Sequence, residues 1–282
     1  MSNTHSNSDW ATSRGAHWRD YAAGMEATFA PLDGSLIQVL RMETACRIAE
    51  IGCGGGATTL ELRRRAPEGS VVHGFDISSD LVEAAKARIP LADKSIEFKL
   101  ADAATEPPPS QLYDRLTSRF GVMFFDDPMA AFSNLRRWLS PDGRFTFAVW
   151  GPPTDNPWMS TVREAAVGIV DLPEAEDDQP GPFRYAQAER FVALLEAAGF
   201  RDVETTPWRE KLATGGGLPA AEAADFALDS FSIGELITAA GDEARAAVRR
   251  ILIEKFSRHL EDGVVRMRAA VNLVSGAPSH RT

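Results

Sequence analysis

The chain contains few of the residues that build disulfide or zinc scaffolds. Only Cys46 and Cys53 occur among its 282 residues, which is too few for a disulfide framework. Neither cysteine has a histidine at zinc-ligand spacing. This cysteine usage favours a reducing compartment, and we expect a cytoplasmic protein. Residues 1–9 are rich in Ser and Asn and lack the features of a secretory signal, so they are predicted to form a disordered tail.

The sequence also lacks long apolar runs and an excess of positive charge. No uninterrupted apolar segment approaches the roughly 18 residues that a membrane span requires. Its 30 basic and 40 acidic residues give a net charge of −10, which argues against binding to phosphate backbones. We therefore expect no nucleic-acid partner and no membrane partner. No pattern indicates an oligomeric state.

An alternation of strands and helices runs through the first half of the chain. Short apolar strands are predicted over residues 47–51, 71–75, 96–100, 114–118 and 145–150. Helices are predicted over 57–66, 80–89 (with Ser79 as its cap) and 129–139, and residues 140–143 are predicted to form a turn. Apolar strands separated by helices indicate a parallel sheet that is covered on both faces.

Helical insertions interrupt this pattern in the second half. A short helical segment is predicted over 157–170, then a helix over 188–198 ended by Gly199, and a strand over 203–208. The segment 215–217 opens an insertion with helices over 219–228 and 242–260, and a closing strand over 264–274 is predicted at a sheet edge. The predicted domains are a tail (1–9), a helical lid (10–45), a core (46–208, with an insertion at about 151–182), a helical insertion (209–262) and a final strand with its tail (263–282).

A glycine-rich loop follows the first strand. It reads Gly52-Cys53-Gly54-Gly55-Gly56 and precedes a helix. Glycines there allow a tight turn and the close approach of a ligand, and amide groups at a helix start suit an anion. The spacing alone also fits a dinucleotide-binding loop or a plain tight turn.

Three acidic residues fall at the carboxyl ends of the first three strands. Asp76 can accept both hydroxyls of a ribose. Asp102 can accept from the amine of an adenine, and Glu50 can hold the loop amides or meet a cationic ligand group. Each alone could be a helix cap or a surface carboxylate, but together they predict a nucleotide-like pocket.

Five segments then carry a family resemblance in their order and spacing. They are Glu50-x-Gly52-x-Gly54-x-Gly56, Gly74-Phe75-Asp76-Ile77-Ser78, Ala101-Asp102-Ala103, the segment 113–118 and the segment 139–144. They resemble the motifs of class I S-adenosylmethionine-dependent methyltransferases, in the small-molecule branch that includes the ubiquinone and menaquinone methyltransferases. The resemblance covers about residues 18–208. It implies an α/β fold: a Rossmann-like, doubly wound, seven-stranded sheet whose last strand is antiparallel.

The resemblance also implies roles for individual residues. Gly52, Gly54 and Gly56 would line the methionine portion of S-adenosylmethionine, and the product would be S-adenosylhomocysteine. The remaining predicted cofactor residues are Asp76 and Ile77 for the ribose, Asp102 and Ala103 for the adenine, Tyr21 for the carboxylate, and Ser118 and Arg119 at the rim. Arg119, a charge at the end of a buried strand, needs a partner, which could be a substrate anion, the cofactor carboxylate or Asp126.

Methyl transfer from a sulfonium is an in-line displacement, so the enzyme must hold the reacting atoms collinear and dry. A base is needed only if the acceptor must lose a proton. His17 in the lid is the candidate catalytic base, against the alternative that the lid only positions the substrate and excludes water. His73 is interpreted as a core residue, His259 as a surface residue, and His5 and His280 lie near the chain ends.

The acceptor is predicted to be small and largely apolar or aromatic. The residues expected to line its pocket are Trp18, Phe120, Met123, Phe124 and Trp158, although aromatic residues also suit a core. The pair Asp155-Asn156 resembles the metal ligands of catechol-type methyltransferases, but the companion acid is absent, so a turn is favoured and no metal is expected. The alternative functions are an NAD(P)-dependent oxidoreductase and a non-catalytic S-adenosylmethionine-binding protein.

Overall fold

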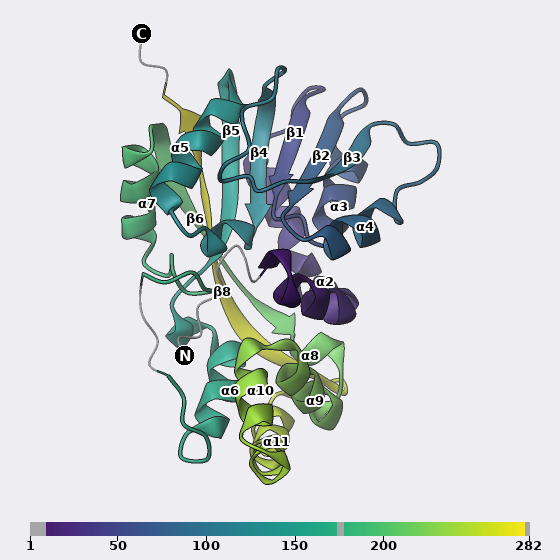
Figure 1. Cartoon of the computed structure of the whole chain (residues 1–282), viewed down its shortest axis with the longest axis vertical. Helices are drawn as coiled ribbons and strands as arrows, with labels where there is room; N and C mark the ends of the chain where they lie inside the picture. Colours follow the sequence, from purple (N-terminus) through teal and green to yellow (C-terminus); the bar gives the residue numbers. More distant parts are fainter. Residues whose placement is uncertain (1–9, 174–177, 280–282) are drawn as a thin grey trace.

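The computed structural model describes residues 10–173 and 178–279 (Figure 1). The predicted tail 1–9, which includes His5, and His280 therefore lie outside the described residues. One sheet with strand order β3-β2-β1-β4-β5-β8-β6 organises the chain. Its strands are β1 (Arg47–Ile51), β2 (Val71–Asp76), β3 (Ile96–Leu100), β4 (Tyr113–Arg119), β5 (Leu139–Trp150), β6 (Phe200–Ala213) and β8 (Val264–Pro278).

The strand directions confirm the predicted fold class. β3, β2, β1, β4 and β5 are parallel, whereas β8 is antiparallel to both of its neighbours, β5 and β6. A two-residue strand, β7 (Leu260–Glu261), pairs with β8 off the main order. This is the Rossmann-like sheet of seven strands with its last strand antiparallel. The parallel strands therefore end at one common edge, where open α/β sheets bind ligands.

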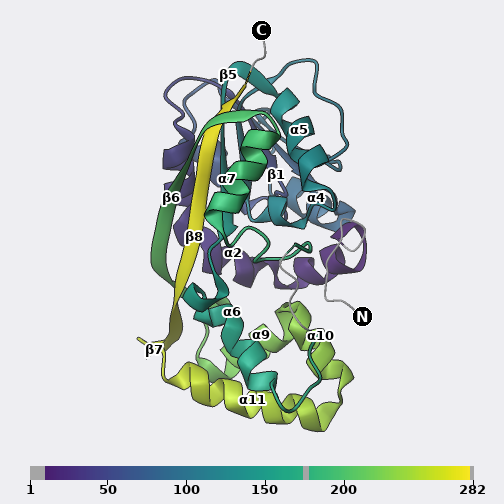
Figure 2. The same cartoon turned by 90° about the vertical axis from the view of Figure 1, so that its left-hand side faces the viewer.

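Helices between the strands cover the sheet. They are α3 (Ala57–Arg65), α4 (Ser79–Lys86), α5 (Pro128–Trp138) and α7 (Ala188–Ala197). Figure 2 shows α5 and α7 on the same face of the sheet. The long helix α2 (Ser13–Leu40) crosses the edge where the parallel strands end (Figure 1). From Met25 onward it buries Met25, Phe29, Leu32, Leu36 and Leu40, so this part of the predicted lid also belongs to the core.

A second group of helices lies beyond this edge. It comprises α6 (Pro157–Ala166), α8 (Thr214–Gly217), α9 (Ala220–Ser230), α10 (Ser232–Ala239) and α11 (Asp242–Ser257). β6 and β8 are 14 and 15 residues long and project past the other strands toward these helices (Figures 1 and 2). Their pairing continues to Ala213 opposite Arg266. Helix α2 consequently lies between the sheet edge and the second group. No helix among the described residues is long and apolar enough to cross a membrane.

Three local predictions were wrong. The closing strand is not an edge strand, because β8 lies between β5 and β6 and is buried almost throughout. Its charges at Arg266 and Arg268 lie in the projecting part, and the continuous apolar run beyond them is typical of a central strand. Residues 140–143, which were predicted to form a turn, belong to β5. They are accommodated by a shift in the pairing with β4, which passes from Tyr113 opposite Leu139 to Arg115 opposite Arg144. The cap of α4 is Ser78, whose Oγ accepts from the Leu81 amide.

Asn156 fastens the turn between β5 and α6 to the neighbouring strand. Its side chain is fully buried, and its Nδ2 donates to the carbonyls of Gly151, Pro152 and Ala270, each at 3.1 Å. Its Oδ1 accepts from the Ala270 amide at 2.9 Å. These bonds confirm the turn interpretation of Asp155-Asn156. The described residues contain no group of three potential metal ligands.

We predict that Asn156→Ala lowers the free energy of unfolding by about 3 kcal/mol, because it leaves several buried polar groups of the backbone without partners. Chemical denaturation followed by circular dichroism measures this loss. The neighbouring Asp155 is exposed, and Asp155→Ala should change stability by no more than about 0.5 kcal/mol. Equal effects of the two substitutions would contradict the role given to Asn156.

Candidate functional site

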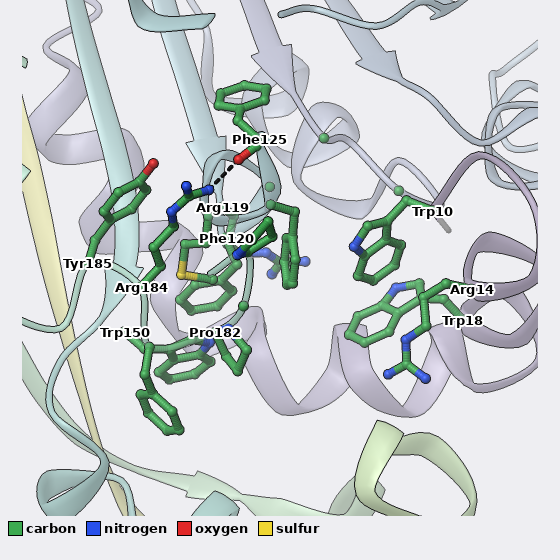
Figure 3. Close-up of a pocket in the computed structure, with 18 of the residues that line it drawn as sticks. Trp10, Arg14, Trp18, Arg119, Phe120, Phe125, Trp150, Pro182, Arg184 and Tyr185 are labelled. Atoms are coloured by element: carbon green, nitrogen blue, oxygen red, sulfur yellow. Dashed lines mark hydrogen bonds between the residues drawn. The ribbon is translucent and has the colours of Figure 1, made fainter. Parts of the chain in front are cut away.

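A cavity of about 1110 Å³ opens at the carboxyl ends of the parallel strands. The glycine loop, helix α2 and the segment 178–187 contribute to its walls, with side chains from α6 and α10 (Figure 3). Ligand pockets for drug-sized molecules usually enclose about 300 to 1,000 Å³. The cavity is therefore large enough to hold a nucleotide-sized cofactor together with a second small molecule.

Gly54 is the loop glycine that leaves space for a ligand. Its backbone is left-handed (φ +52°), and a Cβ built on it would meet no atom within 4 Å. At Gly52 the same Cβ would lie 2.7 Å from the Cα of Gly121, and at Gly56 it would lie 2.5 Å from the Phe98 ring. Gly52 and Gly54 line the cavity, whereas Gly56 is the N-cap of α3 and does not.

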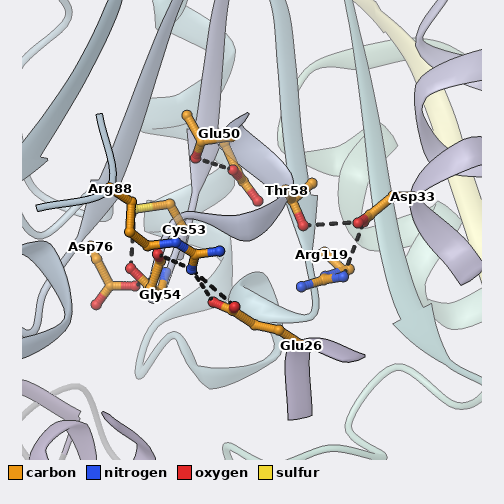
Figure 4. Close-up of polar contacts among 11 residues, drawn as sticks. Glu26, Asp33, Glu50, Cys53, Gly54, Thr58, Asp76, Arg88 and Arg119 are labelled. Carbon is orange, nitrogen blue, oxygen red and sulfur yellow. Dashed lines mark hydrogen bonds and ion pairs between the residues drawn. The ribbon is translucent and has the colours of Figure 1, made fainter. Parts of the chain in front are cut away.

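Asp76 shapes the glycine loop. Its Oδ2 accepts from the Gly54 amide at 2.8 Å (Figure 4). Its Oδ1 accepts from the Ser78 amide at 2.9 Å. Burial raises the pKa of Asp76, and these amides oppose the shift because they stabilise the carboxylate. Asp76 and Ile77 both line the cavity. The carboxylate therefore fixes the loop and borders the ligand space at the same time.

Asp102 occupies the equivalent place at the end of β3. Its Oδ1 accepts from the Ala104 amide at 3.0 Å, and its Oδ2 from the Thr105 hydroxyl at 3.2 Å. Asp102 and Ala103 line the cavity. The structure thus brings Glu50, Asp76 and Asp102 to the same cavity.

Glu50 is buried at the end of β1 and is held by α3. The Thr59 hydroxyl donates to its carboxyl group (Figure 4). Burial raises the pKa of Glu50 to about 8, against the opposing effects of the Thr59 hydrogen bond and the Arg119 charge. Glu50 is therefore mostly protonated at neutral pH. A cation placed beside it would favour its ionised form.

Arg119 is paired with an acid that the sequence analysis did not single out. Its Nη1 lies 3.0 Å from Oδ1 of Asp33 in α2, and both side chains are almost fully buried. The Thr58 hydroxyl donates to the same carboxylate oxygen at 3.1 Å. Asp33 was missed because it lies 86 residues away in the sequence. Arg119 lines the cavity, whereas Ser118 does not and instead accepts from the Gly121 amide at 3.1 Å.

A second ion pair holds α2 against the glycine loop. Arg88, which follows α4, places Nη1 2.9 Å from both carboxylate oxygens of Glu26 in α2. The same nitrogen donates to the Gly55 carbonyl at 2.6 Å (Figure 4). Neither Arg88 nor Glu26 lies in a sequence motif, so this pair could not be predicted from the sequence.

His17 and Tyr21 do not line the cavity, which argues against their predicted roles as base and as cofactor ligand. Their rings lie 5.2 Å apart, and Tyr21 packs at 5.9 Å against Phe226 of α9. The cavity face of α2 carries Trp18 and Phe29. Tyr21 instead faces α9 through its contact with Phe226, and His17 packs against Tyr21.

The other histidines behave as expected. His73 is buried, and its Nδ1 lies 2.7 Å from the Tyr113 hydroxyl. Burial lowers the pKa of His73 to about 4, so it is neutral at physiological pH. His259 is exposed after α11. No histidine is found among the described residues that line the cavity.

An aromatic wall forms the end of the cavity near β4 and β5. Phe120 stacks on Trp150 with ring centroids 4.0 Å apart, and Trp158 lies 5.2 Å from Trp150. Phe120 has a positive φ of 70°, a strained conformation that often marks functional sites. All five residues predicted for the acceptor pocket line the cavity: Trp18, Phe120, Met123, Phe124 and Trp158. Sequence reasoning missed Trp10, Phe29, Trp150 and Phe231, whose segments lack a motif.

The fold and this cavity define a Rossmann-like α/β enzyme with an adenosyl-cofactor type of site. The comparisons identify it further, since residues 49–147 match the family model described as a methyltransferase domain. The chain is a class I S-adenosylmethionine-dependent methyltransferase.

Two named relatives agree with this class, and one solved structure shares the fold. A demethylmenaquinone methyltransferase of Deinococcus radiodurans is 27% identical over 164 residues, covering 55% of this chain and 68% of the relative. Aklanonic acid methyltransferase DauC of a Streptomyces species is 28% identical over 120 residues, covering 42% of this chain and 54% of the relative. The crystal structure of the YcgJ protein from Bacillus subtilis superposes with a TM-score of 0.59 at 18% identity, covering 89% of this chain and all of that one, and shows the same fold.

We predict that Glu50 makes stability fall with rising pH. Its pKa is about 8 in the folded state against an ordinary value of 4.5, so the folded state holds the proton more tightly. The contribution of Glu50 to the free energy of unfolding is complete below about pH 4.5. It falls by up to about 1.4 kcal/mol per pH unit as the pH rises to about 8.

Glu50→Gln keeps the shape of the protonated side chain and removes this titration. The variant should match the parent near pH 5 and be more stable near pH 8.5, as thermal melts across this range would show. Parallel pH profiles for the two proteins would contradict a shifted Glu50.

Proposed function

We propose that the chain transfers a methyl group from S-adenosylmethionine to a small, largely apolar or aromatic acceptor bound in the same cavity. The observation that supports this most strongly is the division of the cavity. One end has the glycine loop and three acidic residues, and the other end has the aromatic wall. The first suits a polar, cationic cofactor and the second a flat apolar molecule.

In this proposal the cofactor lies along the carboxyl ends of β1, β2 and β3. The open space at Gly54 takes its methionine portion, with Gly52 beside it. Asp76 and Ile77 hold the ribose, and Asp102 with Ala103 holds the adenine. When bound, the cofactor supplies an electrophilic methyl group on a positively charged sulfur.

The residues of the chain act by holding the reactants in line and keeping water out. Helix α2 covers the cavity, and it is fixed by the Arg119–Asp33 and Arg88–Glu26 pairs. We propose that it serves as the lid. None of the described cavity residues is a histidine, so the proposal assigns no role to a histidine base. The names of the relatives point to demethylmenaquinone and aklanonic acid as their acceptors, which supports a small-molecule acceptor here.

We predict that Gly54→Ala weakens S-adenosylhomocysteine binding by at least about tenfold, because the new methyl group enters the space assigned to the ligand. Calorimetric titration measures the dissociation constant, and NAD in a parallel titration should not bind. Gly168→Ala is the matched control. Gly168 also has a positive φ, of 77°, and open space at its Cβ, but it is exposed and away from the cavity. Unchanged affinity in the Gly54 variant, or NAD binding by the parent, would refute the proposed cofactor site.

A further inference from the structure

Arg184 presents a guanidinium group to the cavity without an acidic partner. Of the five arginines that line the cavity, Arg14 is paired with Glu235 at 3.1 Å and Arg119 with Asp33 at 3.0 Å. The other three, Arg163, Arg184 and Arg190, have no ion pair among the described residues. Arg184 has no ion pair within the described part of the chain, and its Nη1 donates to the backbone carbonyl of Phe125 (Figure 3). Most of its five donors remain available at a partly buried position.

The adjacent Tyr185 carries a hydroxyl group without a partner. Its side chain is 5% exposed, and its oxygen makes no hydrogen bond to the described residues. Burial raises the pKa of Tyr185, so the hydroxyl remains protonated and able to donate. Buried polar groups in native proteins are nearly always hydrogen-bonded, and each exception requires an explanation.

These two groups lie side by side. The Arg184 Cζ is 5.9 Å from the Tyr185 ring centroid, and Figure 3 shows both side chains extending in the same direction from one backbone segment. Phe120 and Trp150 lie in the same region of the cavity. A cationic donor and a neutral donor therefore stand next to an aromatic wall.

We propose that the methyl acceptor is a flat aromatic molecule with a carboxylate group, and that Arg184 and Tyr185 bind this carboxylate. A guanidinium and a hydroxyl can each donate to one carboxylate oxygen, and charge-assisted bonds of this kind are strong. A doubly charged phosphate suits the pair less well, because Arg184 and Tyr185 together supply one positive charge. The anionic end would fix the position of the ring against Phe120 and Trp150. This inference rests on the proposed function and specifies its acceptor.

The test compares naphthoate with naphthamide, which have nearly the same shape but differ in charge. Each is titrated by calorimetry into the full chain saturated with S-adenosylhomocysteine. We expect naphthoate to bind at least about tenfold more tightly than naphthamide, and naphthyl phosphate to bind more weakly than naphthoate. Equal affinities for the acid and the amide, or no binding of naphthoate, would overturn the proposal. Tighter binding of naphthyl phosphate would overturn the choice of a carboxylate.

Two variants test whether Arg184 and Tyr185 cause the preference for naphthoate over naphthamide. Arg184→Gln should remove the preference for naphthoate while leaving naphthamide binding unchanged. Tyr185→Phe should weaken naphthoate binding by about tenfold or more without lowering the melting temperature, because the lost hydroxyl has no protein partner. A preference that survives both substitutions would overturn the assignment.

Tyr113→Phe is the matched control for the hydroxyl. The Tyr113 hydroxyl is bonded to His73 and lies outside the cavity, so its removal should lower the melting temperature and leave naphthoate binding unchanged. Binding of S-adenosylhomocysteine, measured first, separates the two levels of inference. If S-adenosylhomocysteine does not bind, the proposed function fails. If S-adenosylhomocysteine binds but the protein does not prefer naphthoate to naphthamide, only the acceptor assignment fails.

Discussion

The buried ion pair between Arg119 and Asp33 is the contact on which the geometry of the site depends. It joins the last residue of β4 to the middle of α2, and through Thr58 it also reaches α3. Removing two charges from water is costly, and a buried pair is maintained only when its geometry and additional hydrogen bonds are good. Because either charge alone would be left uncompensated, the helix over the cavity and the end of the strand beneath it are fixed together. Phe120, strained and stacked on Trp150, follows directly.

The two ends of the cavity differ in how their charges are balanced. At the cofactor end the carboxyl groups are held by backbone amides or hydroxyls, as for Asp76, or are neutral, as for Glu50. A cationic ligand there gains attraction without having to displace an internal positive partner. At the aromatic end Arg184 has only a backbone carbonyl as its partner. The two ends of the cavity thus have opposite electrostatic preferences, which would orient the two ligands of the proposed reaction.

Much of the core was predictable because its signals are local. The apolar strand over 47–51, the glycines after it and the acids Asp76 and Asp102 are each defined by a few consecutive residues, and the structure places them at one edge. Features that depend on distant partners could not be predicted this way. The pairing of Arg119 with Asp33, the turn of His17 away from the cavity and the central position of β8 are set by tertiary packing. Sequence reasoning identifies the residue types but not which face of α2 meets the sheet.

The projecting ends of β6 and β8 have a mechanical consequence. Past the sheet edge they form a two-stranded ribbon that connects the sheet to the helices α8, α9, α10 and α11. Two-stranded ribbons are more strongly twisted than wide sheets. A torsion of this ribbon would move these helices, and with them the part of the cavity wall formed by α10. It would also strain their contacts with α2, such as the Arg14–Glu235 pair. The helices beyond the sheet edge are therefore carried by β6 and β8, whereas the glycine loop is carried by β1.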